Sequence, residues 1–279
     1  MRQNARVLRI ASLNVNGIRA AVRRGFDDWL SDRDPDIVGL QEMRCPVDQL
    51  PVLAGYHLSY HPGELAGRNG VAVLTRRPPI AVRHGFGNRR FDAEGRYLEV
   101  DCEPADGHPG LTIGSLYLPK GDRPTDGPAA EAKHRRKLSF MASLRGYLTR
   151  ARKRAQSEGR EFVIMGDFNI AHTALDLRNW RSNRKNSGFL PDERDWFASI
   201  LGPRTLHDVV RRLHGEEPGP YSWWTWRGQA FDQNTGWRID YQLATPELAS
   251  TATTGGTDRE PSYQARMSDH SQVVVDYNL

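Results

Sequence analysis

The sequence predicts a mixed α/β sandwich, on the basis of three observations. Short apolar runs bounded by glycine, proline and polar turn residues recur along the chain, which is typical of strands. Longer segments with apolar residues at three- and four-residue steps lie between some of these runs, which is typical of helices. The strands are joined too irregularly for a simple doubly wound sheet, so we expect an α/β fold of the α+β type.

The strongest helix is expected over residues 129–156, where Leu138, Met141 and Leu144 begin a stripe of helical spacing and Pro128 stands at a tolerated start position. Gly159 is expected to end it. Two further helices are expected over residues 19–31 and 191–201. The expected strands are residues 7–15, 37–41, 70–74, 80–83, 97–100, 111–118, 162–165, 222–226, 237–244 and 272–275.

Length and composition favour one globular domain. The 279 residues are 38% hydrophobic and 26% charged, and no proline-rich, glycine/serine-rich or single-sign charged linker divides them. We therefore predict a single domain over residues 1–279, with residues 1–6 disordered. Nothing in the sequence is apolar and long enough for an ordinary signal peptide or a membrane span, so we expect a cytoplasmic protein without membrane association.

The charge balance suits an anionic partner. The formal net charge is +5, the sequence pI is about 9.3, and arginine is far commoner than lysine. The planar guanidinium group can bind phosphate with two hydrogen bonds, although a GC-rich genome would favour arginine equally well. Cys45 and Cys102 are too few for a zinc site or a disulfide framework, which fits a reducing compartment.

Five apolar runs meet acidic or amide side chains. Because side chains at strand ends converge on the rim of a sheet, these residues can form one site. Several carboxylates brought together repel one another, so such a cluster usually holds a divalent cation or keeps one member protonated. The pattern therefore predicts a metal-assisted hydrolytic site. The residues concerned are Asn14, Asn16, Glu42, Asp167, Asn169, Asp240, Asp269 and His270.

Each residue type suits a particular role. Asp167 directly follows a buried strand, which suits a base that activates water, and Asn169 can donate hydrogen bonds to an oxygen that gains charge. Glu42 offers a hard carboxylate on a stiff element, which suits Mg²⁺. Each also has a structural alternative: Asp167 and Asn169 could stabilise a turn, Glu42 could be an ordinary strand-end charge, and Asn14 could bridge backbone groups.

His270 and Asp240 give the most specific inference. A histidine oriented by a second carboxylate has a fixed tautomer and stays charged near an anion. We predict that Asp240 pairs with His270 and that Asp269 lies near the metal. Any one of these residues could be structural, but five matching segments in order are hard to attribute to coincidence.

Six segments of the chain also match a known pattern. They are NVNGIRA (14–20), LQE (40–42), GDFNIAH (166–172), DLRN…NSGFLPDER (176–194), GWRIDY (236–241) and SDHS (268–271). In these segments the chain resembles the exonuclease III family of DNA-repair nucleases, which includes the abasic-site endonucleases. The GDFN and SDH pieces are shared across the endonuclease/exonuclease/phosphatase superfamily, whereas NVNGIRA, DLRN…NSGF and GWRIDY are more specific. The match runs from about residue 7 to the C-terminus.

The resemblance implies a four-layer sandwich, with two sheets face to face and helices outside. It also implies a Mg²⁺-dependent phosphodiesterase in which Mn²⁺ can substitute. By the family pattern Glu42 binds the metal, with Asn14 and Asp269 nearby. Asp167 positions or deprotonates the attacking water.

The same pattern implies contacts to the scissile phosphate. Asn169 steadies the phosphate, and His270, held by Asp240, contacts a phosphate oxygen. Tyr117, in the segment SLYLP, makes a similar contact.

Residues outside the catalytic set distinguish a DNA enzyme from a phosphoinositide phosphatase. The family places Trp223, Trp237 and Ile239 around a flipped-out, base-less deoxyribose, which an apolar box would fit. The structural alternative is that the tryptophans of residues 222–226 pack into the sandwich core, which we expect for Trp224 and Trp226. Five residues fall where the family grips the DNA backbone, although solvated surface would also explain them: Arg19, Arg123, Asn183, Asn186 and Arg227.

Two positions depart from the family pattern. Lys120 stands where relatives commonly carry a neutral amide, and Asn16 stands where some have Asp. Either could shift the metal preference or the balance between activities. The basic stretch of residues 133–154 is expected to be a solvated outer helix face, because its apolar stripe already faces the core.

These inferences predict a monomeric nuclease that acts on double-stranded DNA with abasic sites or 3′-blocked ends. It would incise 5′ to an abasic site, with 3′-end trimming and 3′→5′ exonuclease action as companions. The alternatives are a relative that is mainly a 3′→5′ exonuclease or 3′-phosphatase, and a catalytically silent DNA-binding protein.

Overall fold

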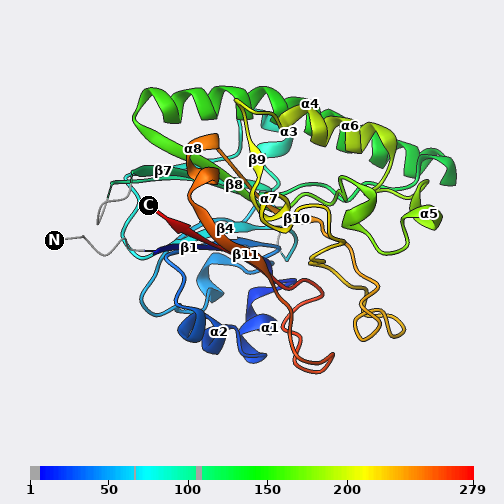
Figure 1. Ribbon diagram of the computed structural model, residues 1–279, viewed down its shortest axis with the longest axis horizontal. Coiled ribbons are helices and arrows are strands. Elements are labelled where there is room, and N and C mark those ends of the chain that lie inside the picture. Colours follow the sequence, from blue (N-terminus) through cyan, green and yellow to red (C-terminus); the bar gives the residue numbers. More distant parts are fainter. Residues whose placement is uncertain (1–6, 66, 105–108) are drawn as a thin grey trace.

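Two six-stranded β-sheets form the centre of the molecule (Figure 1). The computed structural model describes residues 7–65, 67–104 and 109–279, so residues 1–6, for which disorder was expected, lie outside the described part. The first sheet has the strand order β11-β12-β1-β2-β4-β3. Its strands are β1 (Val7–Asn14), β2 (Ile37–Gln41), β3 (His57–His61), β4 (Val71–Thr75), β11 (Ala252–Asp258) and β12 (Gln272–Asn278).

The second sheet has the order β5-β6-β7-β8-β10-β9. Both sheets are mixed, since β1 and β2 pair in parallel in the first sheet and β7 and β8 do so in the second, between antiparallel neighbours. This mixture is why a simple doubly wound sheet does not describe the chain. The strands of the second sheet are β5 (Ala81–His84), β6 (Tyr97–Cys102), β7 (Gly110–Tyr117), β8 (Arg160–Asp167), β9 (His207–Asp208) and β10 (Asp240–Ala244).

Helices cover the outer faces of the sheets, which completes the predicted four-layer sandwich. In Figure 1, α1 and α2 lie below the first sheet, and α4 and α6 lie above the second. The α-helices are α1 (Ile18–Arg23), α2 (Phe26–Arg33), α3 (Arg89–Asp92), α4 (Pro128–Ser157), α5 (Trp180–Asn183), α6 (Pro191–Ile200), α7 (Val209–His214) and α8 (Pro246–Ser250). Short 3₁₀ turns are η1 (Val47–Gln49), η2 (Pro124–Asp126) and η3 (Ala174–Asp176).

The inner faces of the two sheets share an apolar core. Ile10 and Val73 of the first sheet belong to the same buried cluster as Val100, Ile113 and Val163 of the second. Residues from both halves of the chain therefore exclude water together in one cluster between the sheets.

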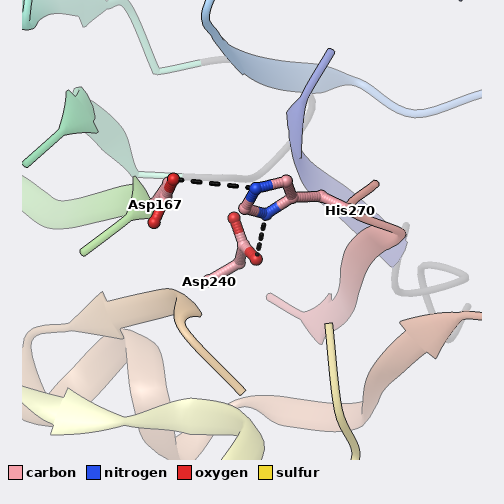
Figure 2. Close-up of side chains that lie close together, drawn as sticks. All are labelled: Asp167, Asp240 and His270. Atoms are coloured by element: carbon pink, nitrogen blue, oxygen red, sulfur yellow. Dashed lines mark hydrogen bonds and ion pairs between the residues drawn. The ribbon is translucent and has the colours of Figure 1, made fainter. Parts of the chain in front are cut away.

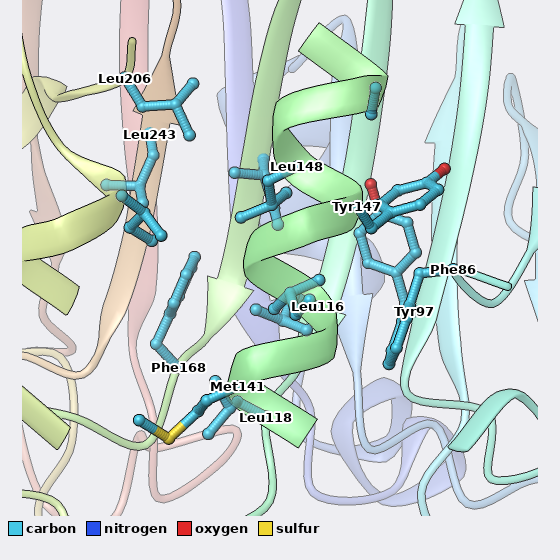
Figure 3. Close-up of a cluster of buried hydrophobic side chains, with 14 of the residues drawn as sticks. Phe86, Tyr97, Leu116, Leu118, Met141, Tyr147, Leu148, Phe168, Leu206 and Leu243 are labelled. Carbon is cyan, nitrogen blue, oxygen red and sulfur yellow. The ribbon is translucent and has the colours of Figure 1, made fainter. Parts of the chain in front are cut away.

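The long helix α4 packs through one stripe and is solvated on the other, as its periodicity predicted. Met141, Leu144 and Leu148 lie in a buried cluster with Phe168 of the neighbouring segment (Figure 3). Arg145 on the same helix is exposed. The expectation of a solvated basic face fails at Lys137, however, which is fully buried.

Two predicted elements differ from the structure. The helix expected over residues 19–31 is two helices, because Gly25 adopts a left-handed φ of 96° that interrupts the turn between α1 and α2. Residues 222–226 form no strand; Trp223 makes only isolated bridges to Trp237 and His270. The strands β3, β9 and β11 were not predicted, and β3 and β11 are edge strands with little full burial and therefore a weak apolar signal.

Strand register brings the predicted polar residues to one end of the sandwich. Asp167 at the end of β8 is opposite Tyr117 of β7 and also opposite Asp240 at the start of β10. In the first sheet Asn14 at the end of β1 is opposite Gln41 of β2. The loops of this end project at the right of Figure 1, away from the labelled N- and C-terminal ends. Within the described residues, no helix is long and apolar enough to cross a membrane.

Replacement of Leu144 by alanine should lower the free energy of unfolding by about 2–5 kcal/mol, because it removes a fully buried side chain from the cluster under α4. Urea denaturation of the purified protein measures this change. Arg145→Ala, at the adjacent exposed position, is the control and should stay within about 0.5 kcal/mol of the parent protein. Equal effects of the two substitutions would contradict the assignment of the buried face.

Candidate active site

Asp167 lies at the centre of the polar cluster. It ends the buried strand β8, and its side chain is 2% exposed. Its Oδ1 atom accepts a hydrogen bond from the backbone N–H of Asn169 at 2.8 Å, and its Oδ2 atom accepts one from Asn169 Nδ2 at 3.1 Å. Asn169 can fold back in this way because its φ of 49° is left-handed. The carboxylate is therefore fixed by the turn that directly follows its strand.

Asn14 joins the two sheets at this point. Its Nδ2 atom donates to Asp167 Oδ2 at 3.0 Å and to Glu42 Oε1 at 2.9 Å. Its Oδ1 atom accepts from the backbone N–H of Asn16 at 3.0 Å. The buried amide thus has partners for both of its ends, and it holds the carboxylates of β8 and of the residue after β2 next to each other.

His270 and Asp240 form the predicted pair. His270 Nδ1 is 2.8 Å from Asp240 Oδ2, and the Ser222 hydroxyl donates to the same oxygen at 2.6 Å. On the other side of the ring, His270 Nε2 is 3.8 Å from Asp167 Oδ2, too far for a hydrogen bond but close enough for a strong electrostatic attraction (Figure 2). The imidazole therefore lies between two carboxylates.

Burial and neighbouring charges shift the pKa values of both Asp167 and His270. Burial raises the pKa of Asp167 to about 7, with Asp240 and Glu42 adding to the rise and the His270 charge opposing it. Burial alone would lower the pKa of His270, but the hydrogen-bonded Asp240 carboxylate, with help from Asp167, raises it to about 10. At neutral pH His270 is accordingly a cation, and Asp167 has a pKa near the surrounding pH, which suits a group that accepts a proton from its ionised form.

Asp269 forms a further part of the acidic cluster. Asn16 Nδ2 donates to its Oδ1 atom at 2.8 Å, and the Trp223 indole N–H donates to its Oδ2 atom at 3.1 Å. Burial acts to raise the pKa of Asp269, but the positive charge of His270 and these hydrogen bonds outweigh it and lower the pKa. Asp269 is therefore ionised in the folded protein at neutral pH.

The donor set fits a divalent cation. Carboxylate oxygens of Glu42 and Asp269 border the cavity, and oxygen is the ligand that hard cations prefer. The exposed Arg44 guanidinium contacts Glu42 Oε2, so this carboxylate already attracts a positive charge from the surface. Ligand atoms of Asp167, Asp240 and His270 also lie within 4.8 Å of one another. His270 Nδ1 bonds Asp240, so this nitrogen is not free to bind a cation. The assignment of the metal to Glu42, with Asp269 nearby, stays a prediction.

A cavity of about 290 Å³ opens beside the cluster. One part of its wall consists of charged side chains, and another part consists of aromatic and other apolar side chains. Charged groups and an apolar surface therefore face the same cavity. The residues that line it are Glu42, Tyr117, Lys120, Asp167, Asn169, Asn186, Ser187, Gly188, Trp223, Trp237, Ile239, Asp269 and His270.

The apolar wall is built from Trp223, Trp237 and Ile239. The two indole rings pack edge to face with centroids 6.4 Å apart, and both rest on a buried cluster that contains Phe189 and Leu177. Ile239 is nearly buried in that cluster and stands next to Asp240 in the chain. The segment that leads into β10 therefore places Ile239 directly beside the residue that pairs with His270.

Residues near the rim include some of the predicted DNA-binding positions. Arg123 donates to Asn186 Oδ1, and Asn186 Nδ2 donates to Asn183 Oδ1 at 2.6 Å, so these three form one polar chain at the cavity edge. Arg19 instead bonds Gln49 at 2.5 Å. Among the described residues, neither Arg19 nor the exposed Arg227 contributes to the lining of this cavity.

The prediction that Trp224 and Trp226 pack into the sandwich core is wrong. Trp224 is buried, but it packs with Tyr221 and Phe231 in a small loop cluster rather than in the sandwich core. Trp226 is partly exposed, with the Arg266 guanidinium 4.2 Å from its ring. Neither tryptophan lies on a strand, since residues 222–226 are a loop.

Sequence reasoning missed two hydroxyl groups that hold the site together. Ser222 bonds Asp240, and Ser268 Oγ donates to the Asn14 backbone oxygen at 2.7 Å. The only sequence signal for these two serines was their position inside residues 222–226 and the segment SDHS (268–271). Tyr117, which was predicted, lines the cavity, and burial together with the Glu42 and Asp167 carboxylates raises its pKa well above the usual value.

Comparison with known proteins defines the class. Residues 11–270 match the endonuclease/exonuclease/phosphatase family, so the chain belongs to that family. It is 31% identical over 274 residues to the DNA repair nuclease APEX1 of Danio rerio, a match that covers 96% of this chain and 81% of that protein. It is 30% identical over 280 residues to exodeoxyribonuclease III of Haemophilus influenzae, covering 97% and 100% respectively.

Solved structures agree with the sequence relatives. An AP endonuclease from Archaeoglobus fulgidus superposes with a TM-score of 0.82 at 28% identity, covering 98% of this chain and all of that one. A 3′ phosphatase from Neisseria bound to a product DNA hairpin gives the same TM-score at 26% identity, with the same coverage. The chain is thus a hydrolytic nuclease of the exonuclease III and AP endonuclease type, as its motifs predicted.

Asp240→Asn should lower the pKa of His270 from about 10, since it removes the main charge that opposes burial and leaves only the attraction of Asp167 and Asp269. The stability that this charge contributes is complete below pH 6.5 and is lost as the pH rises through about 10, so the variant should lose stability mainly at neutral pH and below. NMR titration of labelled histidine measures the shift, with His134, which pairs with Asp192, as internal control. An unchanged pKa of His270 in the variant would contradict the pairing.

Proposed function

We propose that this chain is a DNA-repair phosphodiesterase that incises duplex DNA 5′ to abasic sites. The observation that carries the proposal is the single cavity in which the Asp167–His270 cluster faces the apolar wall of Trp223 and Trp237. Such a wall accepts a sugar without its base, and the adjacent ionic groups can act on the phosphate attached to it. Trimming of 3′-blocked ends and 3′→5′ exonuclease action are proposed companions at the same site.

Each polar residue has a chemical role in this proposal. Asp167 accepts a proton from the attacking water, since burial has raised its basicity. The Asn169 amide steadies the phosphate, while the His270 cation and the Tyr117 hydroxyl face an oxygen on which negative charge develops. Asp240 keeps the His270 ring charged and oriented.

Glu42 and Asp269 would hold a divalent metal ion, with Asn14 beside them. When bound, the metal would neutralise charge on the scissile phosphate. We propose Mg²⁺ as the physiological ion, because carboxylate and water ligands suit it, with Mn²⁺ as a substitute.

The substrate would be gripped outside the cavity by its backbone. Arg123, Asn183 and Asn186 stand together at the rim, and Arg19 and Arg227 are exposed side chains that could reach more distant phosphates. These contacts would give affinity without sequence reading. We propose that the protein acts as a monomer on cytoplasmic DNA.

A second candidate is an enzyme that mainly trims 3′ ends. It is favoured by the Neisseria relative, whose structure is titled a 3′ phosphatase and superposes as well as the Archaeoglobus AP endonuclease. A catalytically silent DNA-binding protein is disfavoured, because the chain retains Asp167, Asn169, Asp240 and His270 in bonded contact.

One incubation separates these candidates. A labelled duplex that carries a single tetrahydrofuran abasic analogue is mixed with the protein in Mg²⁺ and, separately, in EDTA. Internal incision in Mg²⁺ alone supports the proposal, progressive loss of the 3′ end supports the second candidate, and gel retardation without cleavage supports a silent binder.

Asp167→Asn should reduce turnover on the abasic duplex by at least ~10²-fold, the usual contribution of a general base. The substitution keeps the shape of the side chain and one acceptor oxygen, but it removes the proton acceptor and replaces the other oxygen, to which Asn14 or Asn169 donates, by an NH₂ group. Single-turnover kinetics measure the effect. Near-normal turnover would remove Asp167 from the base role and leave the positioning role to be tested.

Trp223→Ala should weaken discrimination between abasic and intact duplex, since it removes one of the two indole rings of the apolar wall. The measurement is the ratio of kcat/KM on the two substrates. Trp226→Ala is the matched control, because Trp226 lies in the same segment but among the described residues does not line the cavity. An unchanged ratio in Trp223→Ala would argue against a sugar pocket.

A further inference from the structure

A buried ion pair lies behind one wall of the cavity. Lys137 of α4 and Glu193 of α6 both have fully buried side chains, and Lys137 Nζ is 2.7 Å from Glu193 Oε1. Burying two charges is costly, and an apolar pair of the same volume is often as stable. A gain in stability therefore does not explain why this ion pair is present. The other hydrogen bonds of the two side chains show which backbone segments the pair holds in place.

Lys137 uses all three of its N–H donors. Besides Glu193, its Nζ atom donates to the backbone oxygen of Asn169 at 2.9 Å and to that of Lys120 at 3.1 Å. Asn169 and Lys120 both line the cavity. The contact at Asn169 is made at a residue with left-handed φ, so the cation helps to hold a backbone conformation that most residues avoid.

Glu193 connects the ion pair to the loop of residues 187–190. Its Oε2 atom accepts the backbone N–H groups of Gly188 at 2.6 Å and Leu190 at 3.0 Å, and its Oε1 atom accepts the Ser187 hydroxyl at 3.0 Å. Ser187 Oγ also lies 2.7 Å from the Lys120 backbone oxygen. Ser187 and Gly188 are cavity-lining residues as well.

The loop at Gly188 passes close to the apolar wall. A methyl group at Gly188 would lie 3.2 Å from Trp237 Cζ3, and the next residue, Phe189, belongs to the buried cluster on which Trp237 packs. A shift of this loop toward the ring would therefore press on Trp237. The ion pair is thus connected on one side to Asn169, which contacts Asp167, and on the other to the tryptophan wall.

We propose that Lys137 and Glu193 are positioning residues for phosphodiester cleavage: one buried ion pair sets the spacing between Asn169, Lys120 and the 187–188 loop. The inference rests on the proposed function, because the segments that it fixes are those that would face the phosphate and the base-less sugar. Neither side chain lines the cavity among the described residues, so both act through the backbone that they hold.

The kinetic test compares three variants on the abasic duplex. Lys137→Met removes the three donors and should lower kcat by about 10²-fold, the cost of a small misplacement of catalytic groups, with a much smaller change in KM. Lys137→Arg keeps a buried cation and should restore a substantial part of kcat. Lys133→Met, one turn earlier on α4 in an exposed pair with Asp122 at 3.2 Å, is the matched control and should keep the parent kcat.

A second readout needs no substrate. The protein contains seven tryptophans, so incorporation of 5-fluorotryptophan gives a small set of ¹⁹F resonances, and that of Trp237 is identified by its absence in Trp237→Phe. Lys137→Met should shift or broaden the Trp237 resonance in the free, folded protein, whereas Lys133→Met should not. This outcome is independent of whether the enzyme cleaves abasic DNA, so failure of the proposed function and failure of this inference are distinguishable.

Two results would overturn the inference. One is a folded Lys137→Met protein with unchanged kcat and an unchanged Trp237 resonance. The other is a loss of activity that follows the folded fraction in thermal melts, with kcat per folded molecule preserved. If Lys137→Met does not fold, Glu193→Gln tests the same pair, because the amide can still accept from Gly188 while losing the charge that Lys137 needs; it should lower kcat and shift Trp237 in the same direction.

Discussion

The structure of the site depends on one buried carboxylate, Asp167, held between an amide and an imidazolium. Asn14 donates to it from the first sheet at 3.0 Å, and His270 places its positive charge 3.8 Å away. Burial, together with repulsion from Asp240 and Glu42, raises the pKa of Asp167, and the positive charge of His270 opposes this rise. The same contacts fasten the two sheets to each other at the end where the chemistry takes place.

Several residues around this carboxylate have unusual backbone conformations. Asn16, Glu42 and Asn169 all have left-handed φ values, between 46° and 51°, and all lie where a strand has just ended beside the cluster. Such conformations are unfavourable for residues with a side chain and persist only where surrounding contacts hold them. Here those contacts are the hydrogen bonds of Asp167 and Asp269 and, behind the wall, the buried cation of Lys137.

The division of the cavity into an ionic part and an apolar part separates two tasks. The ionic part is suited to a phosphate, whatever group the phosphate carries. The apolar part, built on Trp223 and Trp237, is the part that we propose selects the sugar. Relatives titled AP endonuclease and 3′ phosphatase superpose on this chain equally well, which shows that the shared fold does not decide the activity. The difference must come from the side chains and loops around the wall.

Much of this protein was determined by local sequence. The buried strands, the long helix and the acidic and amide residues after β1, β2 and β8 were predictable, because apolar periodicity and side-chain chemistry are properties of short segments. The pairing of Asp240 with His270 was also inferred from residue types and confirmed at 2.8 Å. The break at Gly25, the loop of residues 222–226 and the burial of Lys137 depended on tertiary structure. A glycine can adopt left-handed or right-handed φ with similar ease, so the presence of Gly25 alone did not show that the helix would break there. A lysine in a basic segment is buried only when a distant glutamate and two carbonyl groups meet it.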